Sequence, residues 1–495
     1  MNVININGKL ISAYTENRGY EVSNLLIQYT ITARSMNMTY DEAMKFIKKA
    51  EGLGSIPGLE TITELLRRIG NPQDEMSIIH VAGTNGKGST ISFLSGILAA
   101  AGYRTGIYIS PVVFSYREKL QIITLDHYTD DFEKNKDSNQ NNILHVEYIS
   151  EEDVCRTLEI IKSACNDMTN EGYAHPTVFE IETAMAFLYM KYQQVDFLIL
   201  ETGMGGRLDA TNVIRHPVCS ILTPVSMDHM QYLGNTLEQI AYEKAGIMKS
   251  NSFAVTSLQA PEVLSVFKFK AAELNIPLFT ADSSKAENVR YYDGYTTFEY
   301  PDANKHEKYS IQMLGSYQVQ NAITAITTAR YMGSMGYAIS ENAIKSGPGL
   351  VRWQGRFEKI AASPDIYIDG AHNEKAALNL RDSIEIYFTN RRLIFIIGVL
   401  ADKDYQCMLR ILAPLADTMI TLTPDNNRAL PSYMLAACAK LYCGKVYDER
   451  DIEHAIERAY IEAKTGDVII AFGSLSFLGS LKSIVKARKD ERNNG

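Results

Sequence analysis

Cysteine is scarce in this sequence, with six residues in 495, and none of them belongs to a Cys-x-x-Cys pair. The six are scattered along the chain, at positions 155, 165, 219, 407, 438 and 443. This spacing excludes a dense disulfide framework and a cysteine-rich metal site. We therefore expect reduced thiols and a cytoplasmic protein.

The sequence also lacks long apolar runs and an excess of basic residues. No apolar stretch reaches the roughly 20 residues that a membrane-spanning helix needs. Asparagines interrupt Met1–Leu10 where a signal peptide requires an apolar centre. The net charge of −9 argues against general nucleic-acid binding. We expect neither a membrane nor a nucleic acid as partner.

The hydrophobic pattern that is present predicts an α/β protein with more than one domain, because 495 residues are too many for one core. Helices are expected at 40–49 and 61–69. Strands at 78–82, 106–110, 196–201 and 218–223 then alternate with helices at 88–101, 176–192 and 236–248. Such alternation predicts a parallel sheet covered by helices.

A second α/β alternation begins near residue 366. Its expected strands are 366–369, 393–398, 417–422 and 467–472, and its expected helices are 374–386, 403–412, 431–441, 451–464 and 476–487. The turn Gly347-Pro348-Gly349 places the boundary near 350–356. We thus predict an extension of unknown role at 1–37, a nucleotide-binding domain at 38–352 and a C-terminal domain at 353–495.

Two segments interrupt these alternations. Residues 127–147 contain a stretch, 130–142, that is rich in Asp, Asn and Lys and has no apolar periodicity. This composition predicts a dispensable surface insertion. Residues 285–313 are polar and rich in strand-forming residues, and a helix is expected to begin near Tyr317.

The most informative segment is the glycine-rich turn between the strand at 78–82 and the following helix. Backbone N–H groups of such a turn can surround a phosphate chain, and a lysine inside it can contact the terminal phosphates. The spacing differs from the common Walker A loop, which would have glycine where Val81 stands. The loop consists of Gly83, Thr84, Asn85, Gly86, Lys87, Gly88 and Ser89.

This shorter loop resembles the nucleotide loop of folylpolyglutamate synthases and dihydrofolate synthases, within the wider Mur ligase superfamily. Gly88 after the Gly-Lys pair is typical of the folate branch. The resemblance covers roughly residues 38–480. It implies a P-loop-type ATPase domain with a parallel sheet, followed by a Rossmann-like C-terminal domain.

A possible magnesium site lies close to the loop in the expected fold. A strand delivers Glu201 to its carboxyl end, where ligands gather in open α/β sheets. In the family that Glu201-Thr-Gly-Met-Gly-Gly-Arg resembles, this glutamate binds the metal. The resemblance also implies Mg²⁺ ligation by His229, in Asp228-His229, and by Ser110, in Ser110-Pro111. These donors suit a hard cation that keeps water and phosphate oxygens.

The resemblance implies an unusual role for Lys244, in Glu243-Lys244-Ala245-Gly246-Ile247. The family carbamylates this lysine, and the resulting carboxylate helps to hold metal during phosphoryl transfer. The neutral amine that CO₂ requires would need a buried lysine with a lowered pKa. K⁺ is a further candidate ion.

Three separated residues are expected to hold the base and ribose of ATP: Asn321, Arg356 and Asp369. Arg356 stands in Trp353-Gln354-Gly355-Arg356, where the family usually has Trp-Pro-Gly-Arg. Since these residues flank the domain boundary, we expect ATP in the cleft between domains. His372 and Ser474 are candidates for holding the amino-acid substrate.

The resemblance implies a monomeric ligase that uses ATP to join L-glutamate to the γ-carboxylate of a folate. Lys87, Lys244, Glu201 and His229 would be its catalytic residues. Dihydrofolate synthase activity, alone or in addition, uses the same machinery and remains an alternative. Gly88 argues against a cell-wall or cyanophycin ligase, and the complete metal set argues against a non-catalytic nucleotide-binding regulator.

Overall fold

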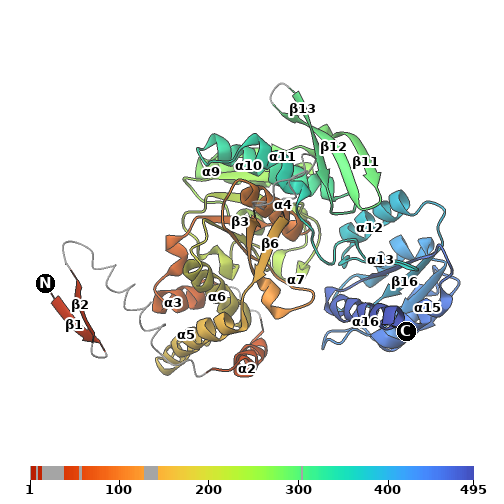
Figure 1. The fold of residues 1–495 in the computed structure, drawn as a ribbon, viewed down its shortest axis with the longest axis horizontal. Coiled ribbons are helices and arrows are strands. Elements are labelled where there is room, and N and C mark those ends of the chain that lie inside the picture. Colours follow the sequence, from red (N-terminus) through yellow and green to blue (C-terminus); the bar gives the residue numbers. More distant parts are fainter. Residues whose placement is uncertain are drawn as a thin grey trace, which may run out of the picture.

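The computed structural model describes residues 2–6, 9–13, 38–54, 58–126, 143–302 and 305–494, with side chains described between 38 and 488. Two α/β units lie side by side (Figure 1), the second formed by the C-terminal part of the chain. The predicted fold class is confirmed, and most predicted strands and helices lie within a few residues of their expected positions.

The first unit is built on an eight-stranded sheet with the order β10-β9-β8-β3-β7-β4-β5-β6. The first six strands in this order are parallel, and the last two pair antiparallel at one edge. The central strands are buried throughout, as expected for a parallel sheet covered on both faces. The strands are β3 (Ile78–Ala82), β4 (Thr105–Tyr108), β5 (Leu120–Asp126), β6 (Ile143–Tyr148), β7 (Phe197–Glu201), β8 (Cys219–Leu222), β9 (Phe253–Ser257) and β10 (Leu278–Ala281).

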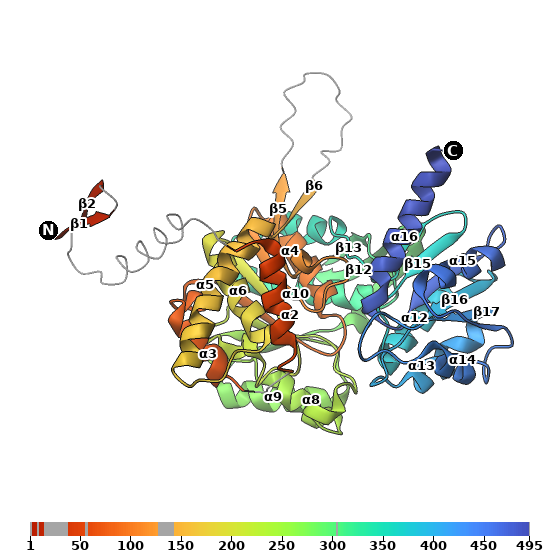
Figure 2. The ribbon, with the colours of Figure 1, turned by 90° about the horizontal axis from the view of Figure 1, so that it is seen from below.

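Helices cover both faces of this sheet (Figure 2). On one face α4 (Lys87–Ala100) packs against α10 (Gln318–Ser334) in a single apolar core. The other face carries α2 (Tyr40–Glu51), α3 (Glu60–Arg68), α5 (Glu151–Asn170) and α6 (Val178–Tyr192). A smaller cluster forms between the sheet and α8 (Leu237–Ala245) with α9 (Pro261–Leu274), beside the short α7 (Met230–Leu233).

The polar stretch near 285–313 forms a separate antiparallel sheet, in agreement with its strand-forming composition. Its strands are β11 (Glu287–Tyr292), β12 (Tyr295–Asp302) and β13 (Lys305–Ile311). The sheet is joined to α10 and is followed by α11 (Glu341–Ser346). It lies next to α12 (Glu374–Tyr387) of the second unit (Figure 1), where Thr296 Oγ1 is 3.0 Å from Tyr387 Oη.

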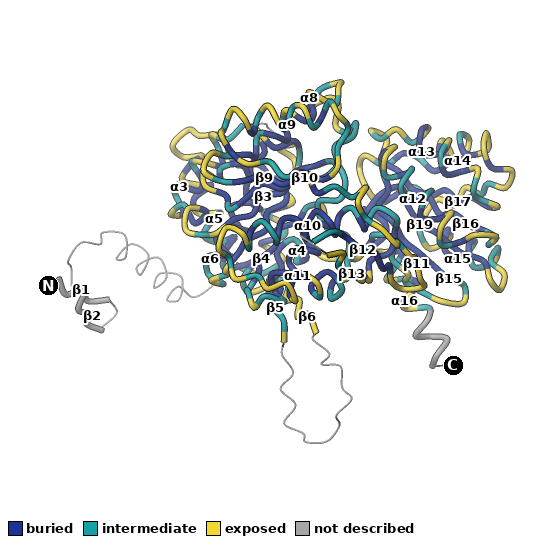
Figure 3. Tube along the Cα trace, turned by 90° about the horizontal axis from the view of Figure 1, so that it is seen from above, coloured by how far each residue is buried: buried dark blue, intermediate teal, exposed yellow. Residues whose placement is uncertain are grey.

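The second unit has a six-stranded sheet with the order β14-β15-β19-β16-β17-β18, parallel except for β14. The strands are β14 (Glu358–Ala361), β15 (Asp365–Ile368), β16 (Leu393–Ile397), β17 (Thr418–Thr421), β18 (Val446–Asp448) and β19 (Val468–Phe472). One face is covered by α12 (Glu374–Tyr387), α13 (Tyr405–Leu412) and α14 (Ser432–Ala439), and the other by α15 (Ile452–Glu462) and α16 (Leu475–Asn494). Figure 3 shows the central strands of both sheets buried together with α4 and α10, while the outer helices carry exposed residues.

Of the predicted N-terminal extension, the structure describes an antiparallel pair, β1 (Asn2–Ile6) with β2 (Lys9–Ala13). The polar segment 130–142 lies outside the described residues, between β5 and β6. Among the helices that the structure describes, none is long and apolar enough to cross a membrane.

Candidate functional site

The glycine-rich loop connects β3 to the N-terminus of α4, as the sequence predicts. Gly86 has φ 84° and precedes Lys87, the first residue of the helix. A Cβ at Gly86 would lie 2.4 Å from Asn321 Oδ1, so only glycine fits this turn. The loop is anchored to the neighbouring strand's end, since Thr84 N donates to Pro224 O at 2.9 Å. The free N–H groups of the helix start make this a site suited to phosphate.

One cavity collects nearly all of the predicted site residues at the carboxyl ends of the parallel strands. Both units contribute to its lining. The predicted residues that line it are Gly83, Thr84, Asn85, Gly86, Lys87, Gly88, Ser89, Ser110, Glu201, His229, Lys244, Asn321, Arg356, Asp369 and His372.

Ser474 is outside the lining of this cavity. Its hydroxyl lies 2.9 Å from Ser476 Oγ and accepts from Ser476 N at the start of α16. Its neighbour Leu475 lines the cavity instead. A helix-start role therefore accounts for the observed contacts of Ser474.

The candidate metal ligands approach the loop from three strand ends. Glu201 ends β7, Ser110 follows β4, and His229 precedes α7. Burial raises the pKa of Glu201, although Lys87, whose Nζ is 3.7 Å from Glu201 Oε1, opposes this. Burial lowers the pKa of His229, which favours the neutral imidazole that metals bind.

These donors fit Mg²⁺ only together with substrate oxygens. Within the described residues, no group of three or more His, Cys, Asp or Glu side chains could hold a metal alone. One buried carboxylate, one imidazole and one hydroxyl beside a phosphate loop match the way Mg²⁺ binds, with few protein ligands plus phosphate and water. The residues therefore fit the ion.

Lys244 is buried in α8, with 4 % of its surface exposed. Its Nζ donates to Gly83 O at 2.9 Å, so it lies directly behind the phosphate loop. Burial, and secondly the charge of Lys87, lowers the pKa of Lys244 to about 7. A substantial fraction of neutral amine at neutral pH follows from that value.

Two of the predicted nucleotide contacts are held rigidly by neighbouring groups. Asp369 Oδ2 accepts from Tyr317 Oη at 3.0 Å and from Phe357 N at 2.8 Å. Asn321 Nδ2 donates to Gln318 Oε1 at 3.0 Å, beside Gly86. These bonds fix side chains from both units in the cavity lining.

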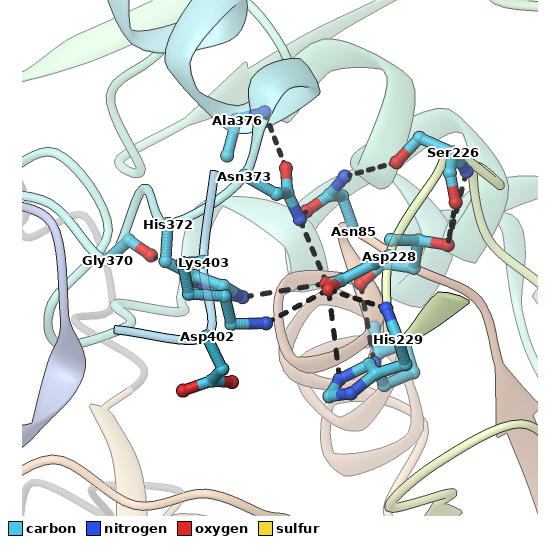
Figure 4. Close-up of polar contacts among 12 residues, drawn as sticks. Asn85, Ser226, Asp228, His229, Gly370, His372, Asn373, Ala376, Asp402 and Lys403 are labelled. Atoms are coloured by element: carbon cyan, nitrogen blue, oxygen red, sulfur yellow. Dashed lines mark hydrogen bonds and ion pairs between the residues drawn. The ribbon is translucent and has the colours of Figure 1, made fainter. Parts of the chain in front are cut away.

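A polar cluster joins the two units at the mouth of the loop, and the sequence did not indicate its long-range partners (Figure 4). Asp228 Oδ1 accepts from Lys403 Nζ at 2.9 Å. Asn373 Nδ2 donates to Asp228 Oδ2 and to Asn85 Oδ1, at 3.2 Å in both cases. Burial opposes ionisation of Asp228, but Lys403 and then His229 hold its pKa well below the usual range. His372 Nε2 lies 3.9 Å from the same carboxylate.

A second group missed by sequence reasoning lies behind Glu201. The buried Asp209 accepts from Met204 N at 2.8 Å and from Thr211 Oγ1 at 2.5 Å. His80 Nε2 lies 2.8 Å from the same threonine oxygen. These bonds tie the glycine turn after Glu201 to β3. The local signal for this group is the string Asp209-Ala210-Thr211, which follows the glycine turn.

A second cavity of about 660 Å³ adjoins the first. It lies between α4, the β5–β6 edge, the connection between the units, and α16. The two cavities share the lining residues Ile109, Pro111, Trp353, Arg356 and Leu475. The two cavities are therefore adjacent and share part of one wall.

Comparison with known proteins agrees with this arrangement. Residues 81–329 match the Mur ligase middle domain and residues 355–475 match the Mur ligase glutamate ligase domain. A Bacillus subtilis dihydrofolate synthase/folylpolyglutamate synthase is 33% identical over 91% of this chain and 100% of its own length. The folylpolyglutamate synthase structure from Thermotoga maritima is 32% identical, with a TM-score of 0.74 over 90% of this chain and 96% of that one. Escherichia coli FolC, solved with DHPP and ADP, is 28% identical, with a TM-score of 0.76 over 92% and 100%.

Proposed function

Since this chain belongs to the folylpolyglutamate synthase and dihydrofolate synthase family of Mur ligases, we propose that it joins L-glutamate to the γ-carboxylate of a folate. It is an ATP-dependent ligase of acids and amino acids. The observation that carries the proposal is the shared wall between the cavity at the phosphate loop and the second cavity. ATP would occupy the first, and the body of the folate the second.

The reaction needs no side-chain nucleophile. The folate carboxylate oxygen attacks the γ-phosphorus of ATP and releases ADP, which leaves an acyl phosphate. The amine of glutamate then attacks the carbonyl carbon, loses a proton and displaces phosphate. Lys87 and the N–H groups of the loop would stabilise the charge on the transferring phosphoryl group, and the cavity would hold the reacting atoms in line.

Ser110, Glu201 and His229 are the residues we propose for holding Mg²⁺. When bound, the ion would neutralise phosphate charge and polarise the transferred group. Lys87 Nζ, 3.7 Å from Glu201 Oε1, lies beside the proposed ion site. K⁺ remains a candidate second ion.

We also propose that Lys244 is carbamylated in the active protein. Its neutral amine would attack CO₂, forming an N–C bond and releasing a proton, and the product would carry a carboxylate in place of a cation. The burial of Lys244 and its lowered pKa support the presence of the neutral amine that attacks CO₂. The nearby Lys87 favours the carboxylate product, because a carboxylate on Lys244 would relieve the repulsion between the two ammonium groups.

Bicarbonate dependence tests this modification. Protein stripped at low pH should regain activity with added bicarbonate, and Lys244→Ala should be nearly inactive yet bind ATP. A short-chain carboxylic acid should partly restore the alanine variant. An unmodified Lys244 amine in fully active protein, observed by ¹³C NMR, would refute carbamylation.

Dihydrofolate synthase activity is the second candidate, favoured by the dual name of the Bacillus subtilis relative. It would use the same phosphate loop and differ only in the acceptor, a dihydropteroate. We further propose a cytoplasmic location, since all six cysteines are free. We also propose that the protein is a monomer.

A substrate panel tests the function and separates the two candidates. ADP release should require glutamate and an acceptor, with dihydropteroate, tetrahydrofolate, and mono- and diglutamyl folates compared under the same conditions. Turnover with tetrahydrofolates but not dihydropteroate would identify a folylpolyglutamate synthase alone. ADP release that is independent of every acceptor would contradict the proposal.

A further inference from the structure

Gln354 occupies the position at which the family's motif, Trp-Pro-Gly-Arg, usually has proline. The side chain makes two contacts that proline could not make. Gln354 Oε1 accepts from Lys482 Nζ at 2.9 Å, and Gln354 Nε2 donates to Tyr148 Oη at 3.4 Å. It thus joins the end of β6 in the first unit to α16 in the second.

Lys482 extends this bridge in two directions. Its Nζ also donates to Glu358 Oε1 at 2.6 Å, and Glu358 Oε2 accepts from Gly355 N at 2.8 Å. The same ammonium lies 4.4 Å from the centre of the Phe114 ring. Phe114 belongs to the turn after Ser110. In this turn the N–H groups of Val113 and Phe114 donate to Glu118 Oε2. One cation therefore contacts the connection between the units and the turn beside the metal site.

All four polar members of this bridge line the second cavity: Tyr148, Gln354, Glu358 and Lys482. We call them the rim. The rest of the lining includes Val112, Ile123, Val351 and Trp353, which form an apolar wall suited to a flat aromatic body. Side chains from both units meet at the rim.

We propose that Gln354 is a specificity-determining residue for the acceptor substrate, because it closes the rim of the second cavity. This inference rests on the proposed function, which places the folate body in that cavity. Each contact of Gln354 is exposed and weak by itself, so the expected effect is a severalfold change in acceptor affinity with no change in ATP affinity.

The single tryptophan of the chain provides a direct measurement. Trp353 is next to Gln354 and lines both cavities. Its fluorescence should change when a folate binds in the absence of ATP, and separately when ATP binds. The variants are Gln354→Ala, Lys482→Met and Tyr148→Phe, with Lys486→Met as control because Lys486 is exposed one turn further along α16.

We expect Gln354→Ala and Lys482→Met to raise the acceptor Kd about threefold to fivefold, while the ATP Kd and the control stay within about 1.5-fold of wild type. Tyr148→Phe should add little in the Gln354→Ala background, since the alanine variant has already lost the contact with Tyr148. A wild-type acceptor Kd in Gln354→Ala, with folate bound normally by the parent protein, would overturn the inference and leave the proposed function intact.

A second measurement does not depend on the substrate. Acrylamide should quench Trp353 more strongly in unliganded Gln354→Ala and Lys482→Met than in Lys486→Met, because an open rim admits the quencher. Equal quenching in all variants would show that the rim does not close the cavity. If the parent protein binds no folate at all, the proposed function fails, and the quenching result still decides whether the rim closes.

Discussion

Lys87 and Lys244 donate to the same carbonyl oxygen, that of Gly83, at 3.2 and 2.9 Å. One lysine starts α4 and the other lies in α8, so two separate helices direct cations to the back of the phosphate loop. Two ammonium groups at one oxygen repel each other, which contributes to the lowered pKa of Lys244. The proposed carbamylation, which replaces one of the two cations with a carboxylate, would relieve this repulsion.

Lys87→Ala should therefore remove most catalysis. We expect kcat to fall by about 10²-fold or more, because one preorganised charge next to the transferring phosphoryl group is lost. ADP release in the presence of glutamate and folate measures the effect. Lys285→Ala, which changes an exposed lysine far from the cavity lining, is the control. Near-normal ADP release by Lys87→Ala would remove the basis for the phosphate-loop assignment.

Gly86→Ala tests the shape of the loop, and the chain contains a matched control. Gly86 and Gly102 have similar φ values, 84° and 91°, so alanine introduces similar backbone strain at both. Only at Gly86 would the new Cβ meet a neighbour, Asn321 Oδ1 at 2.4 Å; at Gly102 it meets nothing within 4 Å. We expect Gly86→Ala to weaken ATP binding about tenfold or more, and Gly102→Ala to lose about 1 kcal/mol of stability with normal ATP binding. Calorimetric titration with ATP and thermal unfolding measure the two effects, and equal ATP affinities would contradict the predicted clash.

Glu201→Gln and His229→Ala test the metal ligands. Each variant would lose one of the proposed donors to Mg²⁺ while the phosphate loop is left in place, so the Mg²⁺ concentration for half-maximal activity should rise about tenfold or more. The measurement is residual ADP release against Mg²⁺ and Mn²⁺ concentration. Residual activity that does not respond to either ion would argue against both ligand roles.

Asp228→Asn tests the contact between the two units. The variant removes the charge that Lys403 pairs with, and we expect a loss of about 1–3 kcal/mol in the free energy of unfolding at neutral pH. Because the folded-state pKa of Asp228 is lowered, its stabilising effect is present above the ordinary aspartate pKa and disappears as the pH falls through the folded-state value. The difference between variant and parent should therefore be constant near neutrality and shrink in acid.

Asp282→Asn is the control for this experiment, since the charge of Asp282 is paired only weakly, at 3.9 Å from an exposed lysine. Asparagine can still accept from Ser284 N, which Asp282 caps. Its effect on the free energy of unfolding should stay below about 0.5 kcal/mol. A variant–parent difference at Asp228 that is independent of pH down to the acid transition would contradict the ionic explanation.

Local signals in the sequence were sufficient for much of the fold. The loop at 83–89 and the strand ending at Glu201 are identified by residues adjacent in sequence, and both reach the predicted edge of the sheet. Helix α5 was missed although its signal was present. Ser150 caps it, and buried residues recur at Val154, Leu158, Ile161 and Cys165, in helical spacing.

Other features could not be predicted because they depend on contacts between distant segments. Asp228 and Lys403 are 175 residues apart, and no local pattern indicates that they meet. The antiparallel edge formed by β5 and β6 likewise depends on which strands pair across the insertion. The residue His80 reads as an ordinary strand residue, and only the fold brings it to Thr211.

The transfer of oxygen from the acceptor to phosphate tests the central claim most directly. A folate labelled with ¹⁸O in its γ-carboxylate should be incubated with the protein, ATP, Mg²⁺ and glutamate, and the released phosphate analysed by mass spectrometry. Formation and breakdown of an acyl phosphate predicts that each phosphate released with product carries one oxygen from the labelled carboxylate. Unlabelled phosphate, formed together with the glutamylated product, would contradict the account.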